Sequence, residues 1–355
     1  MSGIKKTTLE QIAEAAGVSL STVDRVMNRR GGVSPAREAR VLEWAHRLNV
    51  DRVMFRAYMR MLRVAILMQS PKNPFYLGLR NAFNDIGPAL AEMRLHCDVH
   101  YLQLKDVNAT VRQIHGIASA YDALIVVCPD DPDLAATLRQ VALAMPVITL
   151  VTDIPDCGRL AYVGPDNAQM GRVAGELSGR FIGPQGGELL VVLGMKSMIG
   201  QGEREAGFRA VLASRYPSCQ VVTTLESGEN PRRAGDLVSR ALSTWPGIRG
   251  IYNISSGNSN IVQALRAHGK EKQVVLITHE LTADRRRLLL AGSIDAIIDQ
   301  NPWEEARRAL EVLARHFNRA PEPDNHSEHT PFQIYLRENC PAEGQAAYGF
   351  RAGNR

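Results

Sequence analysis

The stretch Thr8–Val41, TLEQIAEAAGVSLSTVDRVMNRRGGVSPAREARV, contains three segments in which apolar residues recur at helical spacing. The first, Leu9–Ala16, follows a capping threonine, and the glycine after it suits the left-handed conformation that ends many helices. The second, Leu20–Met27, follows a capping serine, and the third starts at Ser34-Pro35 and runs to Leu48. Two helices joined by about four residues that include glycine form a helix-turn-helix, whose second helix enters the DNA major groove.

The second helix carries the side chains expected to read bases, on the face left over once its valines pack inward. Arg25 is the strongest candidate, because a guanidinium can donate two hydrogen bonds to guanine O6 and N7. For Ser21 and Asp24 a solvated helix face is the alternative interpretation. The complete set of residues expected to contact DNA is Thr8, Ser19, Leu20, Ser21, Thr22, Arg25, Asn28, Arg56 and Met59.

The charge distribution supports a nucleic-acid-binding head. Residues 1–63 hold 12 Lys and Arg against 6 Asp and Glu, whereas the other 292 of the 355 residues hold 30 against 31. A basic head on a neutral body is typical of a DNA-binding module attached to another domain. A solvated basic surface without a partner is the alternative.

A linker is expected over residues 51–62, between a DNA-binding domain of residues 1–50 and a body of residues 63–340, with 341–355 as a tail. Arg52, Arg56, Arg60 and Arg63 would share one face if this segment were helical. Such a stripe could lie along phosphates, with Met59 as an apolar wedge, and a solvated connector is equally compatible with the sequence.

The body alternates short apolar runs with segments of helical length, which predicts an α/β fold of doubly wound parallel sheets. The expected strands are Val64–Met68, Leu95–Tyr101, Ala123–Val127, Val147–Val151, Glu188–Leu193, Gln220–Thr224, Gly250–Ile254, Val274–Thr278 and Ala296–Ile298. Nine strands suggest two lobes, with a boundary near the Pro- and Gly-rich residues 183–187. The segment HTPFQIYLREN, residues 329–339, is expected to add a strand to one lobe.

Polar and aromatic residues recur where the expected strands end, and ligands of such sheets bind outside the carboxyl ends of strands. Aromatic rings cover the C–H face of a sugar while amides, carboxylates and arginines bind its hydroxyls, so this combination suits a sugar or polyol. For any single residue a capping role is the alternative. The residues expected to bind the effector are Asn73, Phe75, Tyr76, Asp131, Gln201, Arg204, Asn258, Glu280 and Gln300.

Two resemblances extend this interpretation. The stretch from Thr8 to Val41 closely resembles the DNA-binding head of lactose-repressor (LacI/GalR) family regulators, which implies that Leu20 and Ser21 occupy base-reading positions and that Arg25 is the common reading arginine. The body is similar to periplasmic sugar-binding proteins of the ribose type, which implies sugar contacts by the segments NPFY, P-x-D, R-x-x-G-F and D-Q-x-P.

Several positions depart from those families. Asp24 stands where a small hydroxyl residue is usual, Glu280 where aspartate is usual, and Gly257-Asn258 replaces an Asn-Asp pair. The linker is also shorter than the family's hinge segment and lacks its A-x-x-L sequence. An effector other than ordinary ribose or a galactoside is therefore expected.

Other function classes lack their motifs. No phosphate-binding loop, nucleophile elbow or H-E-x-x-H helix is present, so neither an enzyme nor a metal or other cofactor is expected. Five scattered cysteines, the absence of a visible secretory signal and the absence of a membrane-length apolar run favour a cytoplasmic protein rather than an exported transport protein or a membrane protein.

The expected function is therefore that of a ligand-responsive DNA-binding regulator. We expect a homodimer on a pseudo-palindromic operator, because two heads related by a two-fold axis read two half-sites. A nucleobase or inositol effector, and a small-molecule binding protein without a specific role on DNA, remain alternatives. A repressor is expected, with an activator as the alternative.

Overall fold

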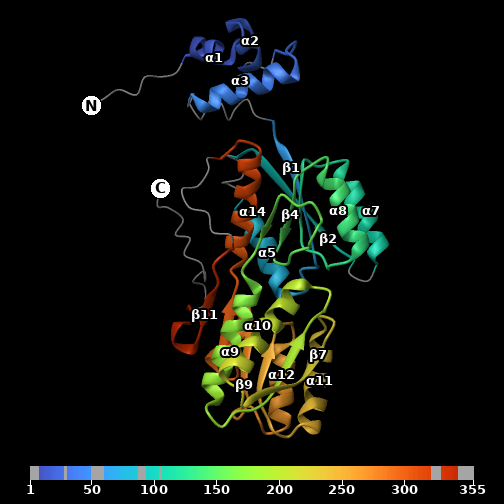
Figure 1. The fold of residues 1–355 in the computed structure, drawn as a ribbon, viewed down its shortest axis with the longest axis vertical. Coiled ribbons are helices and arrows are strands. Elements are labelled where there is room, and N and C mark those ends of the chain that lie inside the picture. The colour runs from blue at the N-terminus through green and yellow to red at the C-terminus, as the bar shows by residue number, and fades with distance from the viewer. Residues whose placement is uncertain are drawn as a thin grey trace, which may run out of the picture.

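The computed structural model describes residues 8–27, 30–48, 60–86, 93–103, 106–320 and 329–342. Its first three helices, α1 (Leu9–Ala16), α2 (Leu20–Met27) and α3 (Pro35–Arg47), form the head (Figure 1). Thr8 caps α1 in a reciprocal capping box with Gln11, and Gly17 ends α1 with a φ of 60°. Buried side chains of all three helices form one small core, which includes Ile12, Val23, Val26, Val41 and Ala45.

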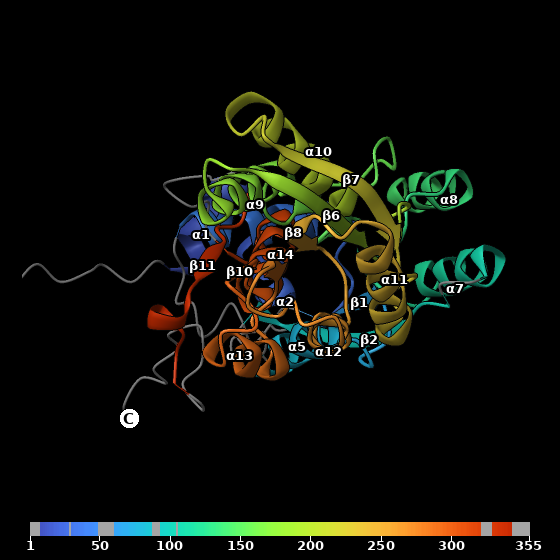
Figure 2. The ribbon, with the colours of Figure 1, turned by 90° about the horizontal axis from the view of Figure 1, so that it is seen from below.

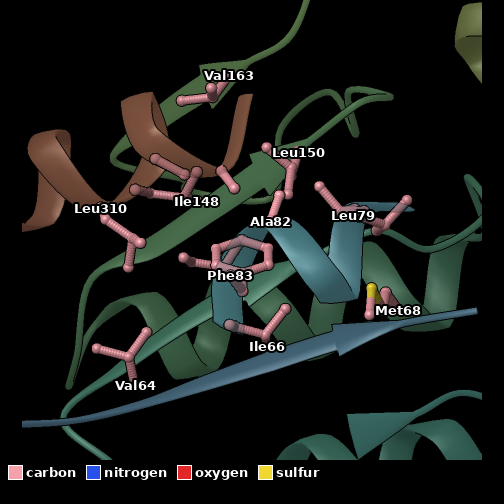
Figure 3. Close-up of a cluster of buried hydrophobic side chains, with 14 of the residues drawn as sticks. Val64, Ile66, Met68, Leu79, Ala82, Phe83, Ile148, Leu150, Val163 and Leu310 are labelled. Carbon is pink, nitrogen blue, oxygen red and sulfur yellow. The ribbon is translucent and has the colours of Figure 1, made fainter. Parts of the chain in front are cut away.

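The first lobe is a five-stranded parallel sheet in the order β2-β1-β3-β4-β5. Its strands are β1 (Leu62–Met68), β2 (Leu95–Tyr101), β3 (Ala123–Val126), β4 (Val147–Leu150) and β5 (Ala161–Val163). The helices α5 (Pro74–Asp85) and α14 (Pro302–His316) cover one face, where Figure 3 shows Phe83 and Leu310 packed over Ile66 and Ile148. The helices α7 (Val107–Ala118) and α8 (Pro132–Ala142) cover the other face.

The second lobe is a six-stranded sheet in the order β11-β10-β9-β8-β6-β7. Its strands are β6 (Gly187–Leu193), β7 (Cys219–Glu226), β8 (Ile248–Asn253), β9 (Val275–His279), β10 (Ala296–Asp299) and β11 (Gln333–Tyr335). Figure 2 shows α9 (Asn167–Ile182) and α10 (Ile199–Arg215) on one face, and α11 (Pro231–Thr244), α12 (Asn258–Ala267) and α13 (Ala283–Leu290) on the other. A short 3-10 helix, Arg337–Asn339, follows β11.

The structure confirms the nine expected strands and the added tail strand, since β11 pairs antiparallel with β10. One strand, β5, was not predicted. It has only three residues, two of them half-buried, so it lacks the apolar run that marks the other strands of this sheet.

The lobe boundary predicted near residues 183–187 is wrong. Met170, Ala174 and Ile182 of α9 are buried in the core of the second lobe, so the chain crosses between lobes at residues 164–166, before this helix. It crosses back at residues 300–301, because α14 packs on the first sheet. A Pro- and Gly-rich turn marks the end of a helix, whereas the apolar face of the helix decides which sheet it covers.

Close packing of α9 on α10 explains this assignment. A Cβ atom at Gly171 would lie 2.0 Å from the carbonyl oxygen of Arg204, and one at Gly207 would lie 2.1 Å from that of Ala168. The two helices therefore approach more closely than larger residues would allow. No helix in the described part of the chain is long and apolar enough to span a lipid bilayer.

Candidate functional site

The two lobes meet where the strands of both sheets end, and a cavity of about 60 Å³ lies between them. Seven of the nine residues expected to bind the effector line it: Asn73, Phe75, Tyr76, Gln201, Arg204, Glu280 and Gln300. They come from α5 in the first lobe, from α10 and the end of β9 in the second, and from the crossing before α14. Their contact with a ligand stays a prediction.

The aromatic wall of the cavity belongs to the start of α5. The side chain of Asn73 accepts a hydrogen bond from the Phe75 backbone N–H at 3.1 Å, and Pro74 occupies the first turn, so the helix begins cleanly here. Phe75 and Tyr76 are both buried, and their rings pack edge to face with centroids 5.1 Å apart. Burial, with Glu229 and Glu280 nearby, raises the pKa of Tyr76 well above its usual value. Its hydroxyl therefore stays protonated.

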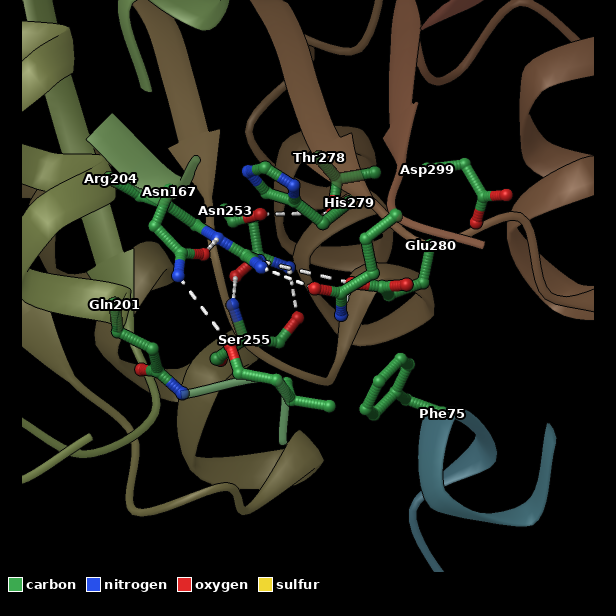
Figure 4. A network of polar contacts seen from close by, with 12 residues as sticks. Phe75, Asn167, Gln201, Arg204, Asn253, Ser255, Thr278, His279, Glu280 and Asp299 are labelled. Carbon is green, nitrogen blue, oxygen red and sulfur yellow. Dashed lines mark hydrogen bonds and ion pairs between the residues drawn. The ribbon is translucent and has the colours of Figure 1, made fainter. Parts of the chain in front are cut away.

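Arg204 is the centre of a buried polar network (Figure 4). Its Nε donates to Asn167 Oδ1 at 2.8 Å, and its Nη2 donates to Gln300 Oε1 at 2.7 Å. Gln300 Nε2 in turn donates to Glu280 Oε1 at 2.7 Å. Arg204 Nη1 lies 3.8 Å from the same Glu280 oxygen, which is too long for a hydrogen bond. Arg204 thus joins Asn167 of α9 to Gln300 of the crossing segment, and through Gln300 it is linked to Glu280 at the end of β9.

Glu280 has an unusual environment. Its Oε2 is buried and has no hydrogen-bond partner among the described residues. Burial and the neighbouring Asp299 raise its pKa to about 8, and the distant Arg204 does not offset this cost. The neutral carboxyl is therefore favoured at neutral pH. A neutral acid both donates and accepts, which suits a ligand hydroxyl.

Two further charged residues line the cavity that the sequence did not indicate. Arg285 on α13 is buried and donates to the backbone oxygens of Ser255 (3.2 Å) and Glu280 (3.4 Å). It is the buried member of a run of three arginines, residues 285–287. Glu229 accepts from Gln201 Nε2 at 2.8 Å and from Asn73 Nδ2 at 3.5 Å, so it touches both lobes. Its position shortly after β7, at the end of a strand, was the signal that could have identified it.

Backbone strain gathers at the same place. Non-glycine residues with positive φ are costly, and they cluster where the surrounding structure holds them for function. Val151 (68°), Glu229 (57°) and Glu280 (65°) line the cavity, and Asn301 (61°) follows Gln300. For the β-branched Val151 this conformation is especially unfavourable. Costly backbone conformations are thus concentrated at the cavity.

Asp131 and Asn258 do not line the cavity. Asp131 caps α8 through bonds from the backbone N–H groups of Asp133 and Leu134, as the alternative interpretation had it. Asn258 is buried in the second lobe, where its Oδ1 accepts from Asn253 Nδ2 at 3.0 Å. Neither residue lies at the cavity with the other seven, because a cap and a ligand contact use the same residue types at the same end of a strand.

On α2 the side chains of Leu20, Ser21 and Arg25 are exposed, as base reading requires. Ser19 caps the helix by accepting from the Thr22 N–H at 3.2 Å. Asp24 forms an ion pair with Arg30 at 2.9 Å. Asn28, Arg56 and Met59 lie outside the described residues.

The two described arginines of the predicted stripe, Arg60 and Arg63, do not lie on one face of a helix. Arg63 lies on β1, not on a helix, and stacks over the Tyr121 ring at 4.4 Å. Arg60 pairs with Asp122 at 2.6 Å. Both arginines contact the first lobe: pairing of β1 overrides the helical spacing at Arg63, and Arg60, just before the strand, is held by its ion pair. Arg52 lies outside the described residues.

Comparison with known families agrees with this architecture. Residues 64–320 match the periplasmic binding protein domain, and residues 8–50 match the bacterial regulatory proteins of the lacI family.

Individual relatives are distant. The HTH-type transcriptional regulator DegA of Bacillus subtilis (strain 168) is 24% identical over 253 residues, which are 67% of this chain and 72% of DegA. The D-allose-binding periplasmic protein of Escherichia coli (strain K12) is 22% identical over 154 residues, 43% of this chain and 49% of that protein.

Solved structures share the fold of the body. The glucose-galactose binding protein GanP from Geobacillus stearothermophilus has a TM-score of 0.72 at 18% identity, over 80% of this chain and all of GanP (100%). A solute binding protein from Burkholderia graminis C4D1M, in complex with D-arabinose, has a TM-score of 0.71 at 20% identity, over 79% and 96% of the two chains.

Proposed function

Because this chain belongs to the periplasmic binding protein domain family and carries a lacI-family regulatory domain at its N-terminus, we propose that it is a transcription regulator whose operator affinity is set by a sugar. The sugar binds between the lobes and favours one lobe arrangement over another. A ligand changes DNA affinity only through such a preference.

The buried network around Arg204 is the observation that carries this proposal. Phe75 lines the cavity with an apolar ring, and the neutral acid Glu280, the amide Gln201 and the guanidinium of Arg285 line it as well. A pyranose has an apolar face and a rim of hydroxyls that both donate and accept, so this wall and this network complement it. The D-allose and D-arabinose bound by relatives of the body support the same ligand class.

The cavity of about 60 Å³ is small for a sugar. Contacts that join the lobes include the backbone bond from the Asp130 N–H to the Ser197 oxygen (2.7 Å) and the Asn73–Glu229 bond. These contacts correspond to a closed arrangement. A sugar would enter a more open one and replace some of these contacts by its own.

On DNA the protein acts as a homodimer. Two heads related by a two-fold axis place two α2 helices in successive major-groove turns of a pseudo-palindromic operator. Arg25 reads a base there, with Leu20 and Ser21 beside it. The protein acts in the cytoplasm, where bacterial operators are accessible.

A thermal-shift screen combined with operator selection tests the proposal. The full chain is screened against D-allose, D-arabinose, D-glucose and D-galactose, with myo-inositol and nucleobases as competing classes. A ligand at 100 times its Kd adds about 2.7 kcal/mol of stability. Operator is then selected from random double-stranded DNA, and its Kd is measured with and without the stabilising ligand. Stabilisation by nucleobases alone, or an operator Kd that no sugar changes, would contradict the proposal.

A further inference from the structure

The root of the linker, residues 60–63, is held to the first lobe by a dense set of contacts outside the ligand cavity. Asp122, at the start of β3, accepts two hydrogen bonds from the Arg60 guanidinium, at 2.6 and 3.1 Å. The same carboxylate accepts from the Arg63 backbone N–H at 2.9 Å. The Arg63 backbone oxygen accepts in return from the Asp122 N–H at 2.8 Å. One carboxylate thus fixes both a side chain and the backbone of the root.

Arg319 holds the root from the opposite side. Its Nη2 donates to the Arg60 backbone oxygen at 2.9 Å, and its Nη1 donates to those of Arg94 (2.6 Å) and Met93 (3.1 Å). The Arg94 oxygen also accepts from the Leu62 N–H at 2.9 Å, where the pairing of β1 with β2 begins. A guanidinium bound to three carbonyls at fixed angles is geometrically specific, which a lysine cannot reproduce.

The backbone supports this arrangement. Asn318, at φ 55°, ends α14 in a left-handed turn, and the Arg319 N–H bonds back to the Ala314 oxygen at 2.6 Å. This turn directs Arg319 away from the helix axis. Arg94, whose oxygen Arg319 binds, also has a positive φ, of 54°. The contact between Arg319 and Arg94 thus has one left-handed residue in it and another directly before it in the chain.

The polar groups of this cluster remain charged. Half-buried surroundings lower the pKa of Arg319, but only to about 10. Partial burial by itself raises the pKa of Asp122. The hydrogen bonds from Arg60 and Arg63 outweigh this effect, so the pKa of Asp122 is lowered overall. The contacts are thus charge-assisted at neutral pH.

The helix α14 connects this cluster to the ligand cavity. It begins two residues after Gln300, which lines the cavity, and it ends three residues before Arg319. Its 15 residues span about 22 Å. Ala306, Leu310 and Leu313 are buried against the first sheet, so the helix is packed along its length, as Figure 1 shows.

We propose that Asp122 and Arg319 clamp the root of the linker and so fix the position from which each DNA-binding head extends. They are positioning residues: neither reads DNA, and both set the separation of the two heads in the dimer. Since α14 leads from the cavity to this clamp, a change at Gln300 reaches the linker root through one packed helix. This inference rests on the proposed function.

The spacing of operator half-sites tests the clamp without requiring a known effector. Full-length wild type, Arg319→Ala and Asp122→Asn are each used to select from random double-stranded DNA, and the half-site sequences and spacings are read. Arg240→Ala is the matched control, because it removes one positive charge from the exposed face of α11. Thermal unfolding of each protein checks that the variants fold.

We expect all four proteins to select the same half-site sequence. Wild type and control select one spacing, and a one-base-pair change costs them about tenfold in Kd. The two clamp variants accept several spacings, and their Kd values for these spacings differ by less than about threefold. If both folded variants accepted as narrow a range of half-site spacings as the wild type, the clamp would be overturned. Failure of the wild type to select any half-site sequence would instead overturn the proposed function.

Discussion

Substitution of Glu280 by glutamine is expected to stabilise the protein by an amount that grows as the pH rises from about 5 to about 8. The substitution keeps the size of the side chain and an oxygen that can accept from Gln300 Nε2. It removes the carboxyl group that burial penalises when it ionises. The pKa of Glu280 is raised from 4.5 to about 8 in the folded protein. The folded state therefore holds this proton more tightly than the unfolded chain does.

The sign and size follow from this difference. The proton on Glu280 stabilises the folded state. This contribution is fully present below pH 4.5, and it is lost as the pH rises through about 8. Between pH 5 and pH 8.5 the wild type should therefore lose about 3–4 kcal/mol that Glu280→Gln retains. For a chain of this size the difference corresponds to a gap in Tm of about 5–8 °C.

Calorimetric unfolding of both proteins at pH 5, 6, 7, 8 and 8.5 measures this gap. Glu338→Gln, which removes a carboxylate from an exposed position, is the control and should show a constant gap. If Glu280→Gln lowered Tm equally at every pH, the carboxylate would be ionised and paired with Arg204 across their 3.8 Å separation. The neutral acid in the cavity would then be refuted.

Three further predictions concern the cavity and the head. Phe75→Ala should weaken binding of the sugar by at least about tenfold while leaving operator selection unchanged, as calorimetry and selection can measure, because it removes the apolar wall of the cavity. Gly171→Ala should destabilise the protein by about 1–3 kcal/mol in urea unfolding, since the new methyl group would meet the Arg204 carbonyl at 2.0 Å; an unchanged midpoint would contradict the close packing of α9 on α10. Arg25→Ala should reduce discrimination at one operator position by about 1–3 kcal/mol, and an equal loss on random DNA would argue against base reading.

Local sequence patterns determined the head and the order of elements in the body. A cap, a run of apolar residues at one period and a terminating glycine act within about ten residues, so Thr8, Gly17 and the stretch between them specify α1 without help from the rest of the chain. The same holds for the strands: runs such as Val64–Met68 are apolar throughout because both faces of a parallel sheet are covered. Because ligands of such sheets bind outside the carboxyl ends of strands, the polar and aromatic residues there indicated seven of the residues that line the cavity.

Tertiary structure alone decided which lobe each helix joins and which polar groups meet. The position of α9 depends on glycines that let it approach α10, and neither sequence spacing nor turn residues encode that partner. Asp131 and Gln300 both follow strands, yet Asp131 caps a helix and Gln300 binds Arg204. The difference arises because Arg204 of α10 lies within reach of Gln300, and a residue's position after a strand does not encode such a neighbour. Arg60 and Arg63 have a helical spacing in the sequence, yet Arg63 lies in the paired strand β1 and Arg60, just before it, pairs with Asp122. Contacts between residues far apart in sequence have no local signal at all: Arg319 and Arg60 are 259 positions apart and meet only in the folded first lobe.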